Sequence, residues 1–181
     1  MDYKTKPLGR NTIRRLSKYV RELFDVPETG PFPVMEALDK LNDVFEECNY
    51  IVVEDSLFDK KTMARCVEND CGGYTIEIKQ SVYEGAYEKR IGAYLGFILH
   101  EICHIFLLCI GYKPIFERSF EDNTIEKRYC SVEWQAKALC GEVAIPYEES
   151  MGMKKEEIME KYNVSKGMAV FRRSLDGLYE W

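Results

Sequence analysis

The sequence predicts an α+β domain that is mostly helical and carries a small antiparallel sheet. Three observations favour this class. Apolar residues recur at helical spacing through much of the 181-residue chain, which is the pattern of amphipathic helices. Only three short runs, at about 50–53, 63–67 and 74–78, have the composition or alternation of strands. The stretch 91–110 is apolar enough to form a central helix on which such a sheet would pack.

The first thirty residues predict an amphipathic helix and a linker. Over 10–24, apolar residues recur at near-helical spacing with basic residues between them. Pro27 follows this helix, and Pro33 is placed to start a second one. We therefore divide the chain into three parts: an N-terminal helix and linker (1–30), a central domain (31–146) and a helical tail packed on the same domain (147–181).

The three strand runs predict a short buried strand followed by a hairpin. Residues 63–67 and 74–78 flank a turn that contains two glycines. Within the second run, Tyr74, Ile76 and Ile78 alternate with polar residues. This alternation is expected when one face of a strand is buried.

Four further helices are predicted, at about 87–109, 125–144, 153–162 and 166–177. Gly111 is a plausible C-terminal cap for the first of them, and Pro146 limits the second. Ser165 is a plausible N-cap for the last.

The composition favours a cytoplasmic protein. A net charge of −6 argues against general nucleic-acid binding. The seven cysteines are odd in number and form no CxxC pair, so free thiols in a reducing compartment are expected. The N-terminus has no apolar segment typical of a signal peptide. Stretch 91–110 approaches the length of a membrane span, but it carries ionisable groups at its middle, so we expect a core helix and no membrane association.

The most informative feature is that the only two histidines fall within five residues, His100-Glu101-Ile102-Cys103-His104. On a helix, residues four apart share one face, so the two imidazoles can bind one metal ion. Burying them with a carboxylate in so apolar a helix would be costly without such a partner. This HExxH pattern is typical of zinc peptidases, in which the histidines bind Zn²⁺ and the glutamate is the general base. We therefore expect a zincin-like domain with Glu101 as the catalytic base.

A catalytic zinc usually keeps three protein ligands, and the chain has no third histidine. A carboxylate on the following helix is the natural candidate. Glu133 lies 29 residues after His104, which allows the chain to turn and return antiparallel. Glu126 lies two turns earlier on the same face and competes with it. Glu142, about 180° round that helix, is expected to be solvated, and Cys103 is more typical of a packing residue.

The sequence resembles the ImmA/IrrE metallopeptidases in two places. The first is the HExxH motif, and the second is 133–146, where Glu133, Ala136 and Pro146 match the family pattern E-x-x-A-x-x-F-A-x-x-L-L-M-P. The resemblance covers roughly 33–175, although the specific motifs cover only 97–104 and 133–146. It implies that Glu133 is the third zinc ligand, and that the two tail helices have a helix-turn-helix-like layout. Cys103 departs from the family, which usually has glycine at that position.

The resemblance implies an endopeptidase that cleaves a helix-turn-helix repressor and relieves repression in a mobile element or a stress response. Peptidases of this kind often bind substrate as an added strand. We expect the run Tyr74–Lys79, with Tyr74, Ile76 and Ile78, to be the sheet edge that receives it. The alternative is a regulatory protein that displaces the repressor without hydrolysis and uses the metal structurally. Direct DNA binding by the tail is not expected, because 154–181 holds nearly as many acidic as basic residues.

Overall fold

The structure is a computed structural model that describes residues 3–114 and 128–174. It is an α+β fold, as the sequence predicts. The α-helices are α1 (Arg10–Leu23), α2 (Val34–Asp39), α3 (Leu41–Val44), α4 (Gln80–Tyr87), α5 (Gly92–Cys109), α6 (Val132–Ala144), α7 (Tyr147–Ser150), α8 (Lys155–Tyr162) and α9 (Lys166–Arg173). The strands are β1 (Asn49–Val53), β2 (Ala64–Glu68) and β3 (Tyr74–Lys79), and short 3-10 turns lie at Asp55–Leu57 and Arg128–Cys130.

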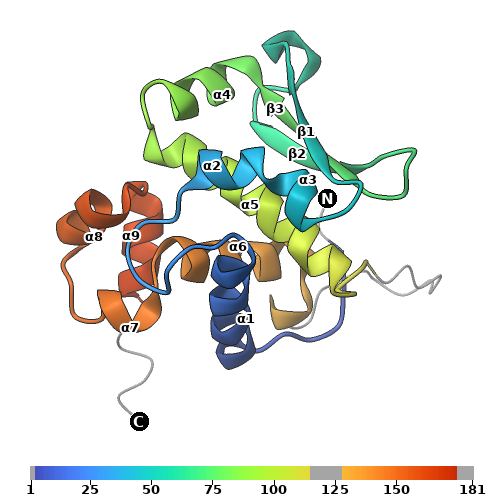
Figure 1. Cartoon of the computed structure of the whole chain (residues 1–181). Coiled ribbons are helices and arrows are strands. Elements are labelled where there is room, and N and C mark those ends of the chain that lie inside the picture. Colours follow the sequence, from blue (N-terminus) through green and yellow to red (C-terminus); the bar gives the residue numbers. More distant parts are fainter. Residues whose placement is uncertain (1–2, 115–127, 175–181) are drawn as a thin grey trace.

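Helix α5 crosses the middle of the molecule (Figure 1). The sheet and α4 lie on one side of it, and α6, α1 and the C-terminal helices lie on the other. Ile98, Ile102 and Phe106 of α5 are completely buried, so burial accounts for its apolar composition. Among the described residues it is the one helix long and apolar enough to cross a membrane, and half of that segment is buried inside the fold.

The sheet is mixed, which corrects the expected antiparallel arrangement. Its strand order is β1-β3-β2. β2 and β3 form the predicted antiparallel hairpin, but β1 runs parallel to β3. The turn between β2 and β3 dictates their orientation locally. The position of β1 depends on a longer connection that crosses over to the far edge, and the pattern of residues in β1 does not encode it.

The prediction that Tyr74–Lys79 forms a sheet edge is wrong. This strand is β3, and it is hydrogen-bonded to β1 on one side and to β2 on the other. Tyr74, Ile76 and Ile78 are buried, as the alternation indicated, but Thr75 and Lys79 on the other face are buried too, as suits a central strand. Within residues 3–114 and 128–174, the unpaired edges of the sheet are those of β1 and β2.

The ends of several helices follow from their sequence. Ser165 is the N-cap of α9, and its hydroxyl accepts a hydrogen bond from the Met168 N–H. Gly111 follows the C-terminus of α5 with φ +89°, and the Tyr112 N–H then donates to the Leu107 carbonyl. Both predicted caps are confirmed. Helix α5 nevertheless begins at Gly92 and not at Tyr87, because Arg90 adopts a left-handed conformation (φ +51°) that separates it from α4.

The linker that follows α1 is held against the core by a buried arginine. Arg21 is 1% exposed. Its guanidinium donates hydrogen bonds to the carbonyls of Pro27, Thr29 and Gly30 in the linker and to the carbonyl of Val143 in α6. Residues 1–30 therefore belong to the same core as the rest of the domain wherever the structure describes them.

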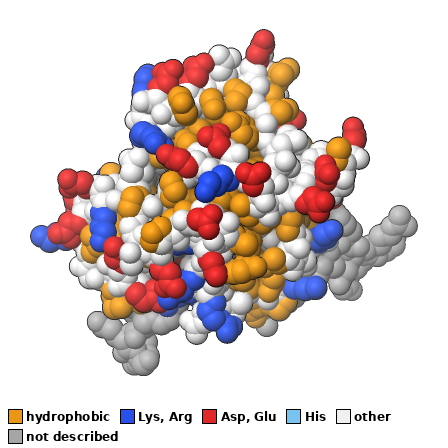
Figure 2. Space-filling view, in the orientation of Figure 1, with side chains coloured by type: hydrophobic (Ala, Val, Ile, Leu, Met, Phe, Trp, Pro, Cys, Tyr) orange, Lys and Arg blue, Asp and Glu red, His pale blue; other side chains and the backbone are white. Residues whose placement is uncertain are grey.

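The tail also packs on the core. Gly92 lies against the loop between α8 and α9, where an added Cβ would be 2.6 Å from the Asn163 carbonyl oxygen. Arg172 of α9 is buried and donates hydrogen bonds to the Ser150 hydroxyl and the Tyr147 carbonyl. It is therefore not displayed for contact with DNA. On the face shown in Figure 2, acidic and basic side chains are interspersed.

Candidate metal centre

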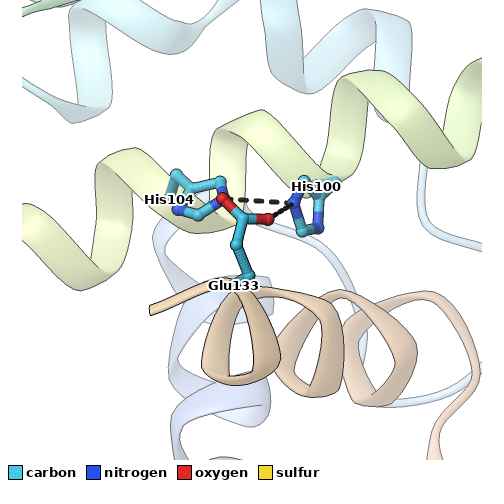
Figure 3. A group of neighbouring side chains, drawn as sticks. All are labelled: His100, His104 and Glu133. Carbon is cyan, nitrogen blue, oxygen red and sulfur yellow. Dashed lines mark hydrogen bonds and ion pairs between the residues drawn. The ribbon is translucent and has the colours of Figure 1, made fainter. Parts of the chain in front are cut away.

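His100 and His104 project from successive turns of α5 towards Glu133, which rises from the first turn of α6 (Figure 3). Helix α6 starts at this point because Ser131 caps it, accepting a hydrogen bond from the Trp134 N–H. The His100 Nε2 and His104 Nε2 atoms are 3.0 Å apart. Glu133 places Oε2 3.2 Å from His100 Nε2 and Oε1 3.5 Å from His104 Nε2.

These distances fit a metal ion. Zinc binds nitrogen and oxygen ligands at about 2.0–2.2 Å, which puts neighbouring ligands of a tetrahedral ion about 3.3 Å apart. The three pairs here are separated by 3.0, 3.2 and 3.5 Å. All three ligand atoms lie within 4.8 Å of one another. Two imidazoles and one carboxylate are also a donor set that transition-metal ions favour. The group could therefore hold a metal ion, as the HExxH motif and the choice of Glu133 predicted.

The ligands differ in exposure. The side chain of His104 is 10% exposed, that of His100 is 23% exposed, and that of Glu133 is 53% exposed. The site is thus anchored in the core at His104 and opens towards solvent at Glu133. Hydrogen bonds from His100 and His104 hold the pKa of Glu133 well below its usual range, so this carboxylate is ionised and ready to bind a cation.

Glu101 lies beside the three ligands without being one of them. Burial raises the pKa of Glu101 to about 6, and the charge of Glu133 adds to the effect. His100 and a hydrogen bond from the backbone N–H of Cys66 act in the opposite direction. A carboxylate with a pKa this close to neutrality can both accept and return a proton near pH 7.

The contact with Cys66 brings in β2, which the sequence did not indicate. The Lys79 N–H donates to the Met63 carbonyl and the Asn69 N–H to the Gly73 carbonyl. Hydrogen-bonded residues alternate in an antiparallel pair, so the odd-numbered residues of β2 pair with β3. Ala64, Cys66 and Glu68 consequently direct their backbone groups towards the free edge. This edge, not β3, is the one next to Glu101.

The competing ligands fall elsewhere. Cys103 is fully buried, and burial beside Cys140 raises the pKa of its thiol well above the usual value, so it is a packing residue between α5 and α6. Glu126 lies outside the described residues. Glu142 was expected to be solvated, and this prediction is wrong. It is 3% exposed because α1 packs on that face of α6, where Arg10 and Arg14 form ion pairs with it.

A cavity of about 520 Å³ adjoins the ligands and was not predicted. It runs from His100 and Glu133 between α5, α6 and α9, and Arg10 and Phe171 also line it. Its walls come from four helices that are distant in sequence, so no local pattern marks them. The cavity is indicated in the sequence only by the small residues that create its space, such as Gly96 and Gly141.

The comparisons with known proteins identify no family. No protein-family model matches this chain, and no curated protein matches it. What can be said of its chemistry therefore comes from its own residues, and the geometry of His100, His104 and Glu133 is the finding that any assignment has to explain.

Proposed function

We propose that the protein is a zinc-dependent endopeptidase. The observation that carries this proposal is the arrangement of His100, His104 and Glu133 at the spacing of zinc ligands, with Glu101 beside them as a fourth, non-ligating group. A site with three protein ligands leaves a position for water and substrate, as catalytic zinc sites do.

Zinc bound at this site would act as a Lewis acid on the scissile carbonyl and would increase the acidity of water. Glu101 accepts the proton from the attacking water and delivers it to the leaving amine. The backbone N–H of Cys66 holds the Glu101 carboxylate in place through its hydrogen bond. Glu133 contributes the negative charge that favours Zn²⁺.

The substrate backbone pairs with β2 in this proposal. Extended peptides commonly bind by adding a strand to a free sheet edge. The outward backbone groups of Ala64 and Glu68 and the outward carbonyl of Cys66 form such an edge, and the hydrogen bond from the Cys66 N–H to Glu101 places it next to the general base. This edge replaces β3 as the candidate for substrate binding.

The proposed substrate is a helix-turn-helix transcriptional repressor in the cytoplasm. This part rests on the resemblance of 97–104 and 133–146 to ImmA/IrrE metallopeptidases, whose members act on such repressors in mobile elements and stress responses. A protein partner, not DNA, is proposed, because Arg172 of the tail is buried in the fold.

The test combines metal analysis with cleavage. The zinc-loaded protein is incubated with a helix-turn-helix repressor encoded beside its gene, with and without a chelator, and products are identified by mass spectrometry. Zinc-dependent cleavage is expected, and Glu101→Gln should abolish cleavage while one zinc per chain is retained. Loss of repressor–DNA binding without any cleaved bond, unchanged by Glu101→Gln, would instead establish the non-proteolytic anti-repressor with a structural metal.

A further inference from the structure

The cavity beside the metal ligands is large enough for a side chain and has walls of two kinds. Its volume of about 520 Å³ falls within the range of about 300–1,000 Å³ typical of ligand pockets. Small residues of three helices, including Ala93, Gly96 and Gly167, open the space. Phe97, Met168 and Phe171 give it an apolar lining, whereas Arg10 and Lys137 add positive charge. We call it the Arg10 pocket.

Arg10 is a largely buried cation in this lining. Its guanidinium lies 5.4 Å from the ring centroid of Trp134 and 5.6 Å from that of Phe171. Its side chain is only 16% exposed. Among the described residues, its buried Nη1 atom has no hydrogen-bond partner. This atom forms an ion pair with Glu142 Oε1 at 3.5 Å. A guanidinium carries five N–H donors, so a ligand in the pocket that supplies an acceptor to the others gains a charge-assisted hydrogen bond here.

Glu142 does not neutralise the pocket, because it is shared. Its Oε1 atom also accepts a hydrogen bond from Arg14 Nε at 3.3 Å. Lys137 adds a further positive charge on the wall. Glu133, the other acidic residue of the lining, would have its charge offset by the bound metal. The pocket thus has a surplus of positive charge at Arg10 and Lys137.

We propose that the Arg10 pocket binds a substrate side chain that carries a carboxylate, and that Arg10 is its partner. This inference rests on the proposed peptidase function, because the pocket begins at two of the metal ligands and a side chain next to the cleaved bond would enter it. A glutamate fits best, since its methylene groups contact the apolar wall and its carboxylate reaches a guanidinium. A basic side chain is repelled by Arg10, and an aliphatic one offers the guanidinium no acceptor.

Binding can be measured separately from catalysis with small zinc-chelating probes. We would use malonyl-hydroxamate derivatives of Glu, Gln, Leu and Gly amides with the zinc-loaded Glu101→Gln protein and measure affinity by calorimetry. The Glu probe should bind about tenfold or more tightly than the Gln probe, since a hydrogen bond between charged groups is stronger than a neutral one. Arg10→Gln should remove this preference. Arg15→Gln is the matched control, because Arg15 is an exposed residue of the same helix.

A second variant tests the space and not the charge. Gly141 lines the pocket, and a Cβ built on it meets no atom within 4 Å. Gly141→Met should therefore fill the pocket without disturbing α6. It should weaken the Glu, Gln and Leu probes by about tenfold or more while leaving the Gly probe unchanged. Melting temperatures of all variants establish that they are folded.

The outcomes separate this inference from the proposed function. If Arg10→Gln and Gly141→Met leave the order of probe affinities unchanged while a peptide library is still cleaved, the Arg10 pocket is wrong and the peptidase stands. If the probes bind as expected but the wild-type protein cleaves no peptide or repressor, the proposed ligand of the Arg10 pocket is supported and the proposed peptidase function is wrong. A Leu probe with a free C-terminal carboxylate that matches the Glu probe would overturn the assignment to a side chain.

Discussion

Replacing Glu133 by Gln should weaken metal binding far more than it weakens the fold. The change keeps the size of the side chain and removes the negative charge that faces His100 and His104 at 3.2 and 3.5 Å. Because the Glu133 side chain is 53% exposed, losing these interactions in the metal-free protein should change the free energy of unfolding by less than about 1 kcal/mol. Removing residues that only support metal ligands lowers affinity about 10–100-fold, so loss of a ligand itself should lower it by about 100-fold or more.

Thermal unfolding in the presence of zinc converts this loss into a measurable difference. A metal at 100 times its dissociation constant adds about 2.7 kcal/mol to the free energy of unfolding, which raises the melting temperature of a chain of this length by roughly 5–11 °C. At the same zinc concentration, a 100-fold weaker site adds about 0.4 kcal/mol and raises it by only about 1–2 °C.

Glu101→Gln is the control, because Glu101 is adjacent to the site and is not a ligand. It should retain the full increase in melting temperature. If Glu133→Gln shows the same increase as the wild-type protein, or if Glu101→Gln loses it, then the assignment of ligand and base to these two glutamates is wrong.

Four other substitutions test the fold that positions the site and the proposed substrate edge. Arg21→Met should lower the free energy of unfolding by about 3 kcal/mol or more, because four carbonyls lose their buried donor. Urea titration measures this loss. The control, Arg15→Met, should leave the free energy of unfolding nearly unchanged. Gly92→Ala should destabilise by about 1–3 kcal/mol, since its Cβ would be 2.6 Å from the Asn163 carbonyl oxygen. Gly141→Ala places its Cβ in open space within α6 and should raise the free energy of unfolding by about 0.5–1 kcal/mol. Equal effects of Gly92→Ala and Gly141→Ala would contradict the packing described. Ala64→Pro removes an outward N–H of β2 and should lower the rate of peptide cleavage about fivefold. The control, Ala64→Val, keeps this N–H and should not lower the rate. If both variants cleave at the wild-type rate, β2 is not the substrate edge.

The sequence predicted those features that depend on neighbouring residues. The spacing of His100 and His104 places both imidazoles on one face of any helix, whatever surrounds it. Ser165 and Gly111 act through hydrogen bonds to residues within one helical turn. The turn between β2 and β3 likewise sets their antiparallel pairing. Each of these is a short-range consequence of residue type, so it can be read without knowing the rest of the fold.

The features that the sequence did not predict depend on distant packing. β3 is central because β1 pairs with its second edge, and no residue pattern within Tyr74–Lys79 indicates this pairing. Glu142 is buried because α1, more than 120 residues earlier, covers that face of α6. The contribution of Cys66 leaves no signal at all, since it is made by a backbone N–H that almost any residue would supply.

Helix α6 positions the third metal ligand through both short-range features and distant packing. It carries Glu133 towards α5 in its first turn, and near its other end it carries Glu142, which is paired with Arg10 and Arg14 of α1. Rotation of α6 about its axis would separate the buried Glu142 carboxylate from both arginines, and a buried charge without its partners is costly. Such rotation would also carry Glu133 away from His100 and His104. The buried glutamate that looked solvated in the sequence therefore helps to hold the third ligand in place, and Arg10 connects this anchor to the pocket beside the metal.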